Sequence, residues 1–114
     1  MKALVVAALL GSLGGCAKKA EPPPAAVVQM PADEVKRGQD ACDAYVAKVC
    51  ACTAPAAAQE CKLAKALPDA IQLSLGVAAG TQKSDEARSA IREIRKVVKG
   101  CVESLAQLPA LGCP

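Results

Sequence analysis

Cysteine is the residue type with the most chemistry to offer in this 114-residue chain. The seven cysteines are Cys16, Cys42, Cys50, Cys52, Cys61, Cys101 and Cys113. Thiolates can bind soft metal ions, exchange disulfides or form structural bridges, depending on their spacing and compartment. Cys50 and Cys52 are separated by one residue, so a bridge between them would be strained. The role of the cysteines therefore depends on where the chain resides and which elements carry them.

The remaining side chains argue against an enzyme and against a cofactor. The chain has no histidine, its acidic residues are scattered, and its glycines form no phosphate-binding loop. Tyr45 is the single aromatic residue and the formal net charge is only +3. Single-stranded nucleic acids are bound on aromatic platforms, so we expect no nucleic-acid partner.

The first residues, MKALVVAALLGSLGGC, have the form of an export signal. Lys2 precedes an apolar run that is far shorter than the roughly 20 residues of a membrane-spanning helix. Leu13-Gly14-Gly15-Cys16 resembles the lipobox of bacterial lipoproteins. This resemblance implies cleavage after Gly15 and attachment of a lipid to the sulfur of Cys16. An ordinary secretory signal cut near the same point is the alternative.

The lipoprotein resemblance implies a membrane anchor and a place in the bacterial cell envelope. Ala17 after the lipidated cysteine implies an outer membrane location, facing the periplasm. We expect residues 1–15 to be the signal peptide and residues 16–31 to be a proline-rich tether. Such a tether extends by about 3.1 Å per residue where it is polyproline-like, which gives a reach of up to about 40 Å. Residues 32–114 would form the cysteine-rich domain.

Helical periodicity predicts that this domain is all-α, with three main helices. The first covers residues 32–50, and the second begins near Pro55 and is kinked or split at Pro68. Residues 71–77 also alternate as in a strand, but no other segment offers a partner strand, so helix is favoured. In the third helix, Ser84 is the expected cap. A heptad seam follows and comprises Ala87, Ile91, Ile94, Val98, Cys101, Leu105 and Leu108.

Six cysteines in an exported domain indicate three disulfides. Many connectivities are open to six cysteines, and the one we favour ties each helix to another and fixes the C-terminal tail. It pairs Cys42 with Cys101, Cys50 with Cys61, and Cys52 with Cys113. Each bridge is worth about 2–4 kcal/mol, which is a large share of the stability of a small domain with few aromatic residues. The class predicted is therefore a small, disulfide-stapled helical bundle.

A thiol-based site for copper or zinc is the alternative use of these residues. Its ligands would be Cys50, Cys52, Cys61 and Cys101, because thiolates on facing helices suit soft metals. The lack of histidine and the oxidising compartment count against this alternative. Structural bridges are therefore favoured, with no resident metal.

The third helix also carries a row of basic residues, which we call the basic face. Its members are Arg88, Arg92, Arg95, Lys96 and Lys99, and they fall within an arc of about 100° on a regular helix. Such a row could bind anionic lipid or an envelope polymer. We favour the simpler alternative, a solvated face that aids solubility. Leu73 and Val77 form a second apolar face on helix two. This face could contact a protein partner, but we expect helix one or the C-terminal tail to cover it.

Together these features predict a lipid-anchored, non-enzymatic structural or binding protein of the bacterial cell envelope. Its partners would be the membrane, through the lipid, and an envelope protein. Metal binding through thiolates, and anionic-lipid or polymer binding through the basic face, are the two alternatives.

Overall fold

The structure is a computed structural model that describes residues 28–114. Its elements are α1 (Ala32–Ala51), α2 (Pro55–Ala64), α3 (Ala66–Gly80), α4 (Ser84–Gln107) and a short 3-10 helix, η1 (Leu108–Leu111). The described residues contain helices and no strand, and they carry three disulfides. The predicted all-α, disulfide-stapled bundle is therefore confirmed, as is helix rather than strand for residues 71–77.

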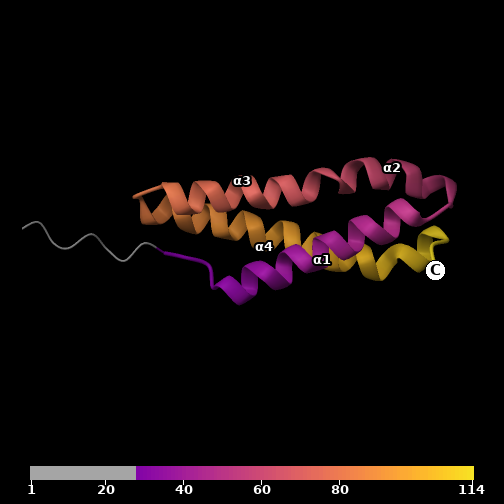
Figure 1. The fold of residues 1–114 in the computed structure, drawn as a ribbon, viewed down its shortest axis with the longest axis horizontal. Helices are drawn as coiled ribbons and strands as arrows, with labels where there is room; N and C mark the ends of the chain where they lie inside the picture. Colours follow the sequence, from indigo (N-terminus) through magenta and orange to yellow (C-terminus); the bar gives the residue numbers. More distant parts are fainter. Residues whose placement is uncertain (1–27) are drawn as a thin grey trace, which may run out of the picture.

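The helices form an elongated bundle in which α2 and α3 follow one another along one rod (Figure 1). α4 returns alongside α3, and α1 packs against both α4 and α2. The start of α1 and the α3–α4 connection lie at one end, which we call the hairpin end (Figure 1). The α1–α2 connection and the C-terminus lie at the opposite end, which we call the cysteine end.

The second predicted helix is split, and the break lies at Lys65 rather than at Pro68 itself. A proline has no N–H to donate, and its ring clashes with the carbonyl four residues earlier. The carbonyl concerned is that of Ala64, the last residue of α2. Pro68 lies in the first turn of α3, where backbone N–H groups have no partner within the helix. The proline therefore ends the preceding helix and is accommodated at the start of the next.

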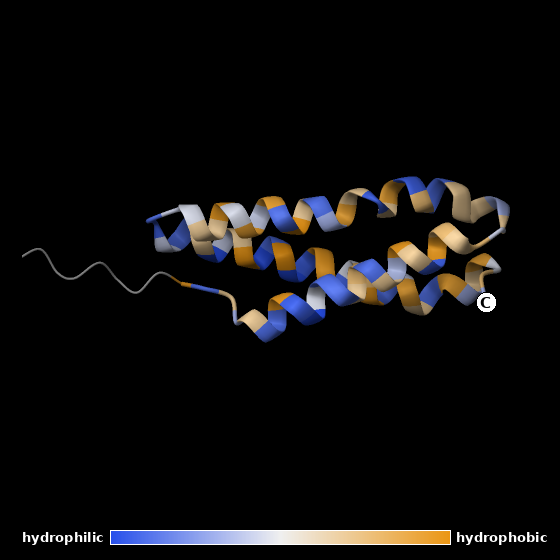
Figure 2. Cartoon of the chain, in the orientation of Figure 1, coloured by the Kyte–Doolittle hydropathy of each residue, from blue (hydrophilic) through white to orange (hydrophobic). Residues whose placement is uncertain are grey.

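Small aliphatic side chains and cystines make up the core. The heptad seam of α4 is confirmed, because each of its residues is buried or packs against the buried core. Val49 from α1 and Ile71 from α3 are almost completely enclosed in the same cluster. No polar or charged side chain is buried within residues 28–114. Figure 2 shows the result, with hydrophobic positions recurring along each helix between hydrophilic ones.

Gly38 brings α1 close to α4. It is buried in the first half of α1, and a Cβ at this position would lie 2.7 Å from a methyl carbon of Val98. That separation is well inside van der Waals contact, so a larger side chain would force the helices or Val98 to move. Glycine has a low helix propensity, but Gly38 is retained in this helix as a packing residue that lets α1 approach α4.

The start of α4 differs from the prediction. Ser84 is the first residue of the helix rather than its cap, and Lys83 precedes it without a side-chain capping bond. Thr81 organises the turn, because its hydroxyl accepts the N–H of Lys83 at 3.2 Å and donates to Glu86 at 2.7 Å. The preference of serine for helix caps is a local tendency. Here Thr81, in the turn before the helix, makes the side-chain hydrogen bonds instead.

The packed part of the chain begins before α1. Val28 and Met30 pack against a small cluster formed by Ala78, Ala90 and Ile91 at the hairpin end. These two residues were assigned to the tether, so the packed region begins four residues earlier than predicted. Cys16, its lipobox and tether residues 17–27 lie outside the described part of the chain. Within residues 28–114, no helix is both long and apolar enough to cross a membrane.

Candidate functional site

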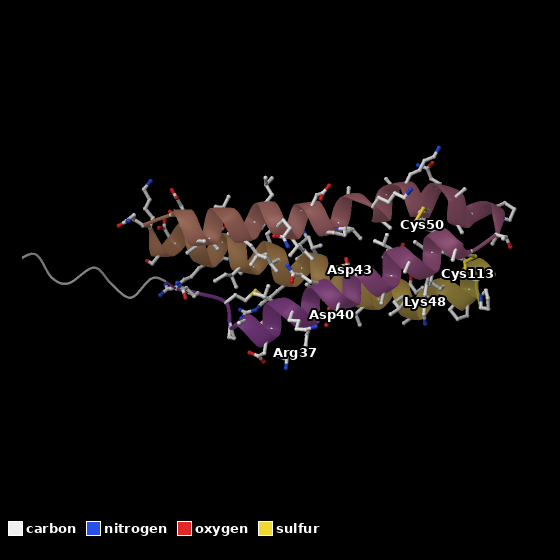
Figure 3. The ribbon with its side chains drawn as sticks, viewed as in Figure 1. Arg37, Asp40, Asp43, Lys48, Cys50 and Cys113 are labelled. Atoms are coloured by element: carbon white, nitrogen blue, oxygen red, sulfur yellow. A yellow bond between two sulfur atoms is a disulfide. The ribbon has the colours of Figure 1, made fainter. Side chains whose placement is uncertain are left out.

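The six cysteines of the described domain form three disulfides. Cys42 is joined to Cys101, Cys50 to Cys61, and Cys52 to Cys113. These are the same three pairs that were favoured from the sequence. The first joins α1 to α4 inside the core, and the other two lie at the cysteine end, where Figure 3 labels Cys50 and Cys113.

A left-handed glycine places Cys113 for its bridge. Gly112 has a φ of 86°, a conformation that residues with a Cβ adopt only with strain. The N–H of Cys113 bonds to the carbonyl of Leu108, and that of Gly112 bonds to the carbonyl of Pro109. This pair of bonds is the Schellman arrangement that closes a helical end. It turns the tail back so that Cys113 is buried against Cys52.

The alternative metal site is not supported by this arrangement. It needs Cys50, Cys52, Cys61 and Cys101 as thiolates around one ion, but each of them is bonded to another sulfur. Within residues 28–114, no cluster of three or more cysteine or carboxylate side chains is placed to hold a metal ion. In this disulfide-bonded structure the four sulfurs are therefore not thiolates that could act together as ligands.

The basic face is exposed along its whole length, but its charges are not equivalent. Arg95 donates two hydrogen bonds to the carboxylate of Glu34 on α1, at 2.6 and 3.0 Å. These hydrogen bonds and the positive charge hold the pKa of Glu34 below its usual value. Lys99 lies 3.6 Å from Glu103. Within the described residues, the basic residues Arg88, Arg92 and Lys96 have no ion-pair partner.

The N-terminal segment enters the domain beside this basic face. Val28 and Gln29 line a shallow depression of about 240 Å³ together with Arg88, Arg92 and Arg95. Because residues 16–27 precede this point in the chain, the predicted lipid anchor is connected to the domain at the hairpin end. The two arginines without an ion pair are therefore next to the place where the anchor segment joins the bundle.

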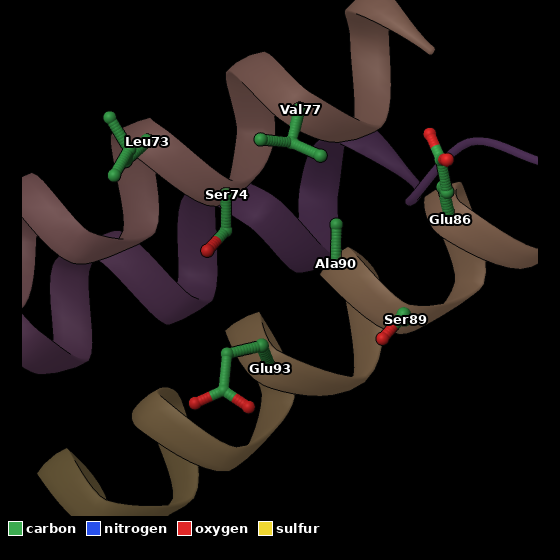
Figure 4. A pocket seen from close by; sticks show the side chains of 7 residues that line it. All are labelled: Leu73, Ser74, Val77, Glu86, Ser89, Ala90 and Glu93. Atoms are coloured by element: carbon green, nitrogen blue, oxygen red, sulfur yellow. The ribbon is translucent and has the colours of Figure 1, made fainter. Parts of the chain in front are cut away.

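The second apolar face predicted on helix two is uncovered in the described part of the chain. Leu73 is 76% exposed and Val77 is 52% exposed, both on α3. They border a groove of about 420 Å³ between α3 and α4. Figure 4 shows its lining, with Leu73, Ser74 and Val77 on α3 and Glu86, Ser89, Ala90 and Glu93 on α4. The expectation that the rest of the chain covers this face is therefore wrong for residues 28–114.

A second depression extends the groove towards the cysteine end. It has a volume of about 280 Å³ and shares Glu93 with the first, so the two depressions adjoin at this residue along α4. Leu63 borders it and is 58% exposed, while Lys96 and Gly100 line its α4 side. We refer to the two depressions together as the α4 groove. The sequence contained a signal for this groove. Ala90 and Val97 are one heptad apart, next to the heptad seam, and so form a second apolar row on the same helix.

Tyr45 lies at the inner edge of this groove. Its ring is buried and its hydroxyl donates to a carboxylate oxygen of Glu60 at 3.4 Å, which links α1 to α2. Burial raises the pKa of the Tyr45 hydroxyl, and the negative charge of Glu60 adds to this rise. The hydroxyl therefore stays protonated at neutral pH and acts as a hydrogen-bond donor rather than as a base.

Comparison with known proteins adds no relatives. No known protein family matches the chain, and neither a curated protein nor a solved structure is significantly similar to it.

Proposed function

We propose that this protein is a lipid-anchored, non-enzymatic binding protein of the bacterial cell envelope. The observation that carries the proposal is the pairing of the cysteines. The six cysteines of the domain are used in three bridges among themselves, which leaves no cysteine in the chain to pair with Cys16. Cys16 is also the residue that follows Leu13-Gly14-Gly15, the lipobox-like motif. Disulfides persist in exported proteins, so the bridges and the export signal support one another.

A lipid on Cys16 would hold the domain at a membrane surface rather than across it. The tether sets the reach of the domain from that anchor, and Ala17 favours the outer membrane facing the periplasm. A bundle held in this way displays its long faces to other envelope components. The α4 groove and the basic face are the two surfaces available for binding.

Lipidation is tested by expressing the full chain in a bacterium that processes lipoproteins and feeding radiolabelled palmitate. We expect the label to enter the protein and the mature mass to begin at a diacylglyceryl Cys16. Cys16→Ser should remove the label and leave the unprocessed precursor. Ser12→Ala, a leader substitution outside the lipobox-like motif, should have no effect. A mature chain that begins at Ala17 or elsewhere without lipid would disprove the anchor.

Binding of the basic face to anionic lipid is the second candidate function. It is favoured by Arg88 and Arg92, which have no ion-pair partner within residues 28–114 and lie beside the segment that leads to the anchor. Near an anionic surface each such cation contributes about 1 kcal/mol at physiological salt. A weak basic surface next to a lipid would hold the hairpin end against the membrane.

This second candidate is tested with residues 16–114 carrying Cys16→Ser and produced without residues 1–15, so that neither the lipid nor the apolar leader dominates. Arg88, Arg92 and Lys96 are changed together to Gln, and a control changes Lys48, Lys62 and Lys65 to Gln. Both variants lose the same charge, but the control residues lie nearer the cysteine end. We expect only the first variant to lose sedimentation with phosphatidylglycerol vesicles, by about two orders of magnitude at low salt. Equal losses of vesicle binding in the two variants would mean that binding depends on net charge and not on the position of the basic face.

A further inference from the structure

The exposed apolar side chains of the domain are concentrated in one place. Within residues 28–114 four large hydrophobic residues are strongly exposed, and three of them border the α4 groove: Leu63, Leu73 and Val77. The fourth, Val102, lies outside it. Scattered exposed apolar residues are normal on a monomer, whereas a contiguous set rimmed by polar residues indicates a contact surface.

Two opposite charges lie at the middle of the α4 groove. Glu93 lines both depressions, and Lys96, one turn later on α4, lines the second. Both side chains are exposed, and neither has an ion-pair partner within the described residues. Elsewhere in the domain, charges at this spacing do pair, as Lys83 and Glu86 do at 3.0 Å. Glu93 and Lys96 are therefore available to a molecule that binds in the groove.

We propose that the α4 groove binds the α4 groove of a second copy of this chain, around a two-fold axis that passes between Glu93 and Lys96. In a two-fold contact, residue i of one copy meets residue j of the other and j meets i. Glu93 then faces the Lys96 of the second copy, and Lys96 faces its Glu93. The two α4 helices are antiparallel, so the Leu73 and Val77 end of each groove meets the Leu63 and Gly100 end of the other.

The pattern of charge favours a second copy over other occupants. A groove for a basic or an acidic partner helix would carry one sign of charge along its rim, so as to attract that partner. The lining carries three carboxylates and one ammonium, but Glu86 is paired with Lys83, and Glu60 accepts from Tyr45. The charges left for an occupant are therefore Glu93 and Lys96, one acid and one base on either side of the proposed axis. Gly100 leaves space at the receiving end, because a Cβ there would have no neighbour within 4 Å. The contact is a single shallow groove, so we expect a weak dimer with a dissociation constant of about micromolar.

The dimer is tested on the purified full-length protein by sedimentation equilibrium in density-matched, non-ionic detergent solution. The result does not depend on lipid at Cys16, so a failure here is distinct from a failure of the anchor. Val77→Gln should weaken the dimer by about tenfold, because a buried apolar contact is lost. Val102→Gln is the matched control, since both valines are 52% exposed and only Val77 borders the groove. It should leave the dimer unchanged.

Charge exchange at the axis provides the sharper test. Glu93→Lys and Lys96→Glu should each weaken the dimer by more than about tenfold, because like charges then face one another. The double variant Glu93→Lys/Lys96→Glu should recover it. Mixing the two single variants should give a heterodimer, since one copy then carries two lysines and the other two glutamates.

Three results would overturn the proposal. One is a wild-type chain that remains monomeric up to about millimolar concentration, far above the expected dissociation constant. Another is equal behaviour of Val77→Gln and Val102→Gln. The third is a double charge variant no better than the singles, which would leave the groove to a different protein partner. Helical circular dichroism should be the same for all variants, because every substituted side chain is exposed.

Discussion

The cysteine end and the hairpin end of the bundle are held together by different means. All three disulfides lie from the middle of α1 towards the cysteine end, and α3 has no covalent link to another helix. The hairpin end is held by apolar packing, by the Glu34–Arg95 pair, and by Val28 and Met30. The difference follows the positions of the six cysteines, none of which lies at the hairpin end within residues 28–114.

The buried clusters also differ along the bundle. The main cluster includes Val49 and Leu108 towards the cysteine end, together with the cystine that joins α1 to α4. The hairpin end buries a smaller cluster of two alanines and Ile91, and no bridge lies there within residues 28–114. The disulfides therefore reinforce the part of the bundle that holds the main core, whereas the hairpin end depends on non-covalent contacts. This division predicts that different substitutions will destabilise the two ends.

The largest effect is expected from removing the bridge between α1 and α4, because it closes a long loop and both of its cysteines are completely buried in the core. Cys42→Ala/Cys101→Ala opens a loop spanning 59 residues, and the chain-entropy model gives a loss of about 4 kcal/mol. Cys50→Ala/Cys61→Ala opens a loop spanning 11 residues and should cost about 3 kcal/mol. Urea unfolding of the two double variants measures the order. The reverse order would mean that the bridges act mainly through native-state packing rather than loop length.

The next effect tests α3, which no bridge joins to another helix. Ile71→Ala should cost about 3 kcal/mol, because Ile71 is almost completely enclosed and its removal leaves a cavity. Leu73→Ala, two residues away but 76% exposed, should change stability by less than about 0.5 kcal/mol. Urea unfolding gives both values.

Amide hydrogen exchange shows which helices lose stability in the Ile71→Ala variant. We expect faster exchange in α3 while amides near Cys42 and Cys101 stay protected. Uniform loss of protection across the bundle would mean that the two ends unfold as a single unit.

The sequence was sufficient for features that depend on local pattern. The seam from Ala87 to Leu108, the helix start at Pro55 and the helical state of residues 71–77 follow from spacing and proline chemistry. Antiparallel topology brings the end of α1 near the start of α2 and the end of α4, but it leaves many connectivities open. The favoured pairs were those that tie each helix to another and fix the tail, and they are the pairs observed.

Features that depend on two distant elements were not predictable in the same way. The contact of Gly38 with Val98 requires the separation of α1 and α4, which no local pattern contains. The ion pair of Glu34 with Arg95 spans 61 residues, and it neutralises a residue that had been assigned to a free basic face. The α4 groove likewise depends on which side of the α3–α4 hairpin α1 covers. Tertiary placement, rather than propensity, decides these features.

A smaller effect tests the close approach at the hairpin end. Gly38→Ala should destabilise the protein by about 1 kcal/mol, because the clash with the stiff, β-branched Val98 outweighs the better helix propensity of alanine. Gly76→Ala is the matched control in α3, where a Cβ would have no neighbour within 4 Å. This control should stabilise the protein by about 0.5–1 kcal/mol. Thermal unfolding of both variants should give shifts of opposite sign, and a stabilised Gly38→Ala variant would refute the packing role.

The smallest effect concerns the ion pair between α1 and α4 at the hairpin end. Arg95 lowers the pKa of Glu34 from its usual value of 4.5, so the folded state binds the proton less tightly than the unfolded state does. The stabilisation is therefore fully present above pH 4.5 and is lost as the pH falls through the lowered pKa. Glu34→Gln should be slightly less stable than the wild type near neutral pH, and this difference should vanish in acid.

Urea midpoints measured from about pH 7 down to about pH 3 follow that loss. Asp43→Asn is the matched control, because it removes an exposed carboxylate of α1 that has no ion pair within the described residues. High salt should shrink the Glu34→Gln difference only partly, since the two hydrogen bonds remain when the charges are screened. A difference that persists unchanged at low pH would assign the role of Glu34 to packing and not to its charge. The hairpin end would then depend on apolar contacts alone, and its contrast with the covalently linked cysteine end would be sharper.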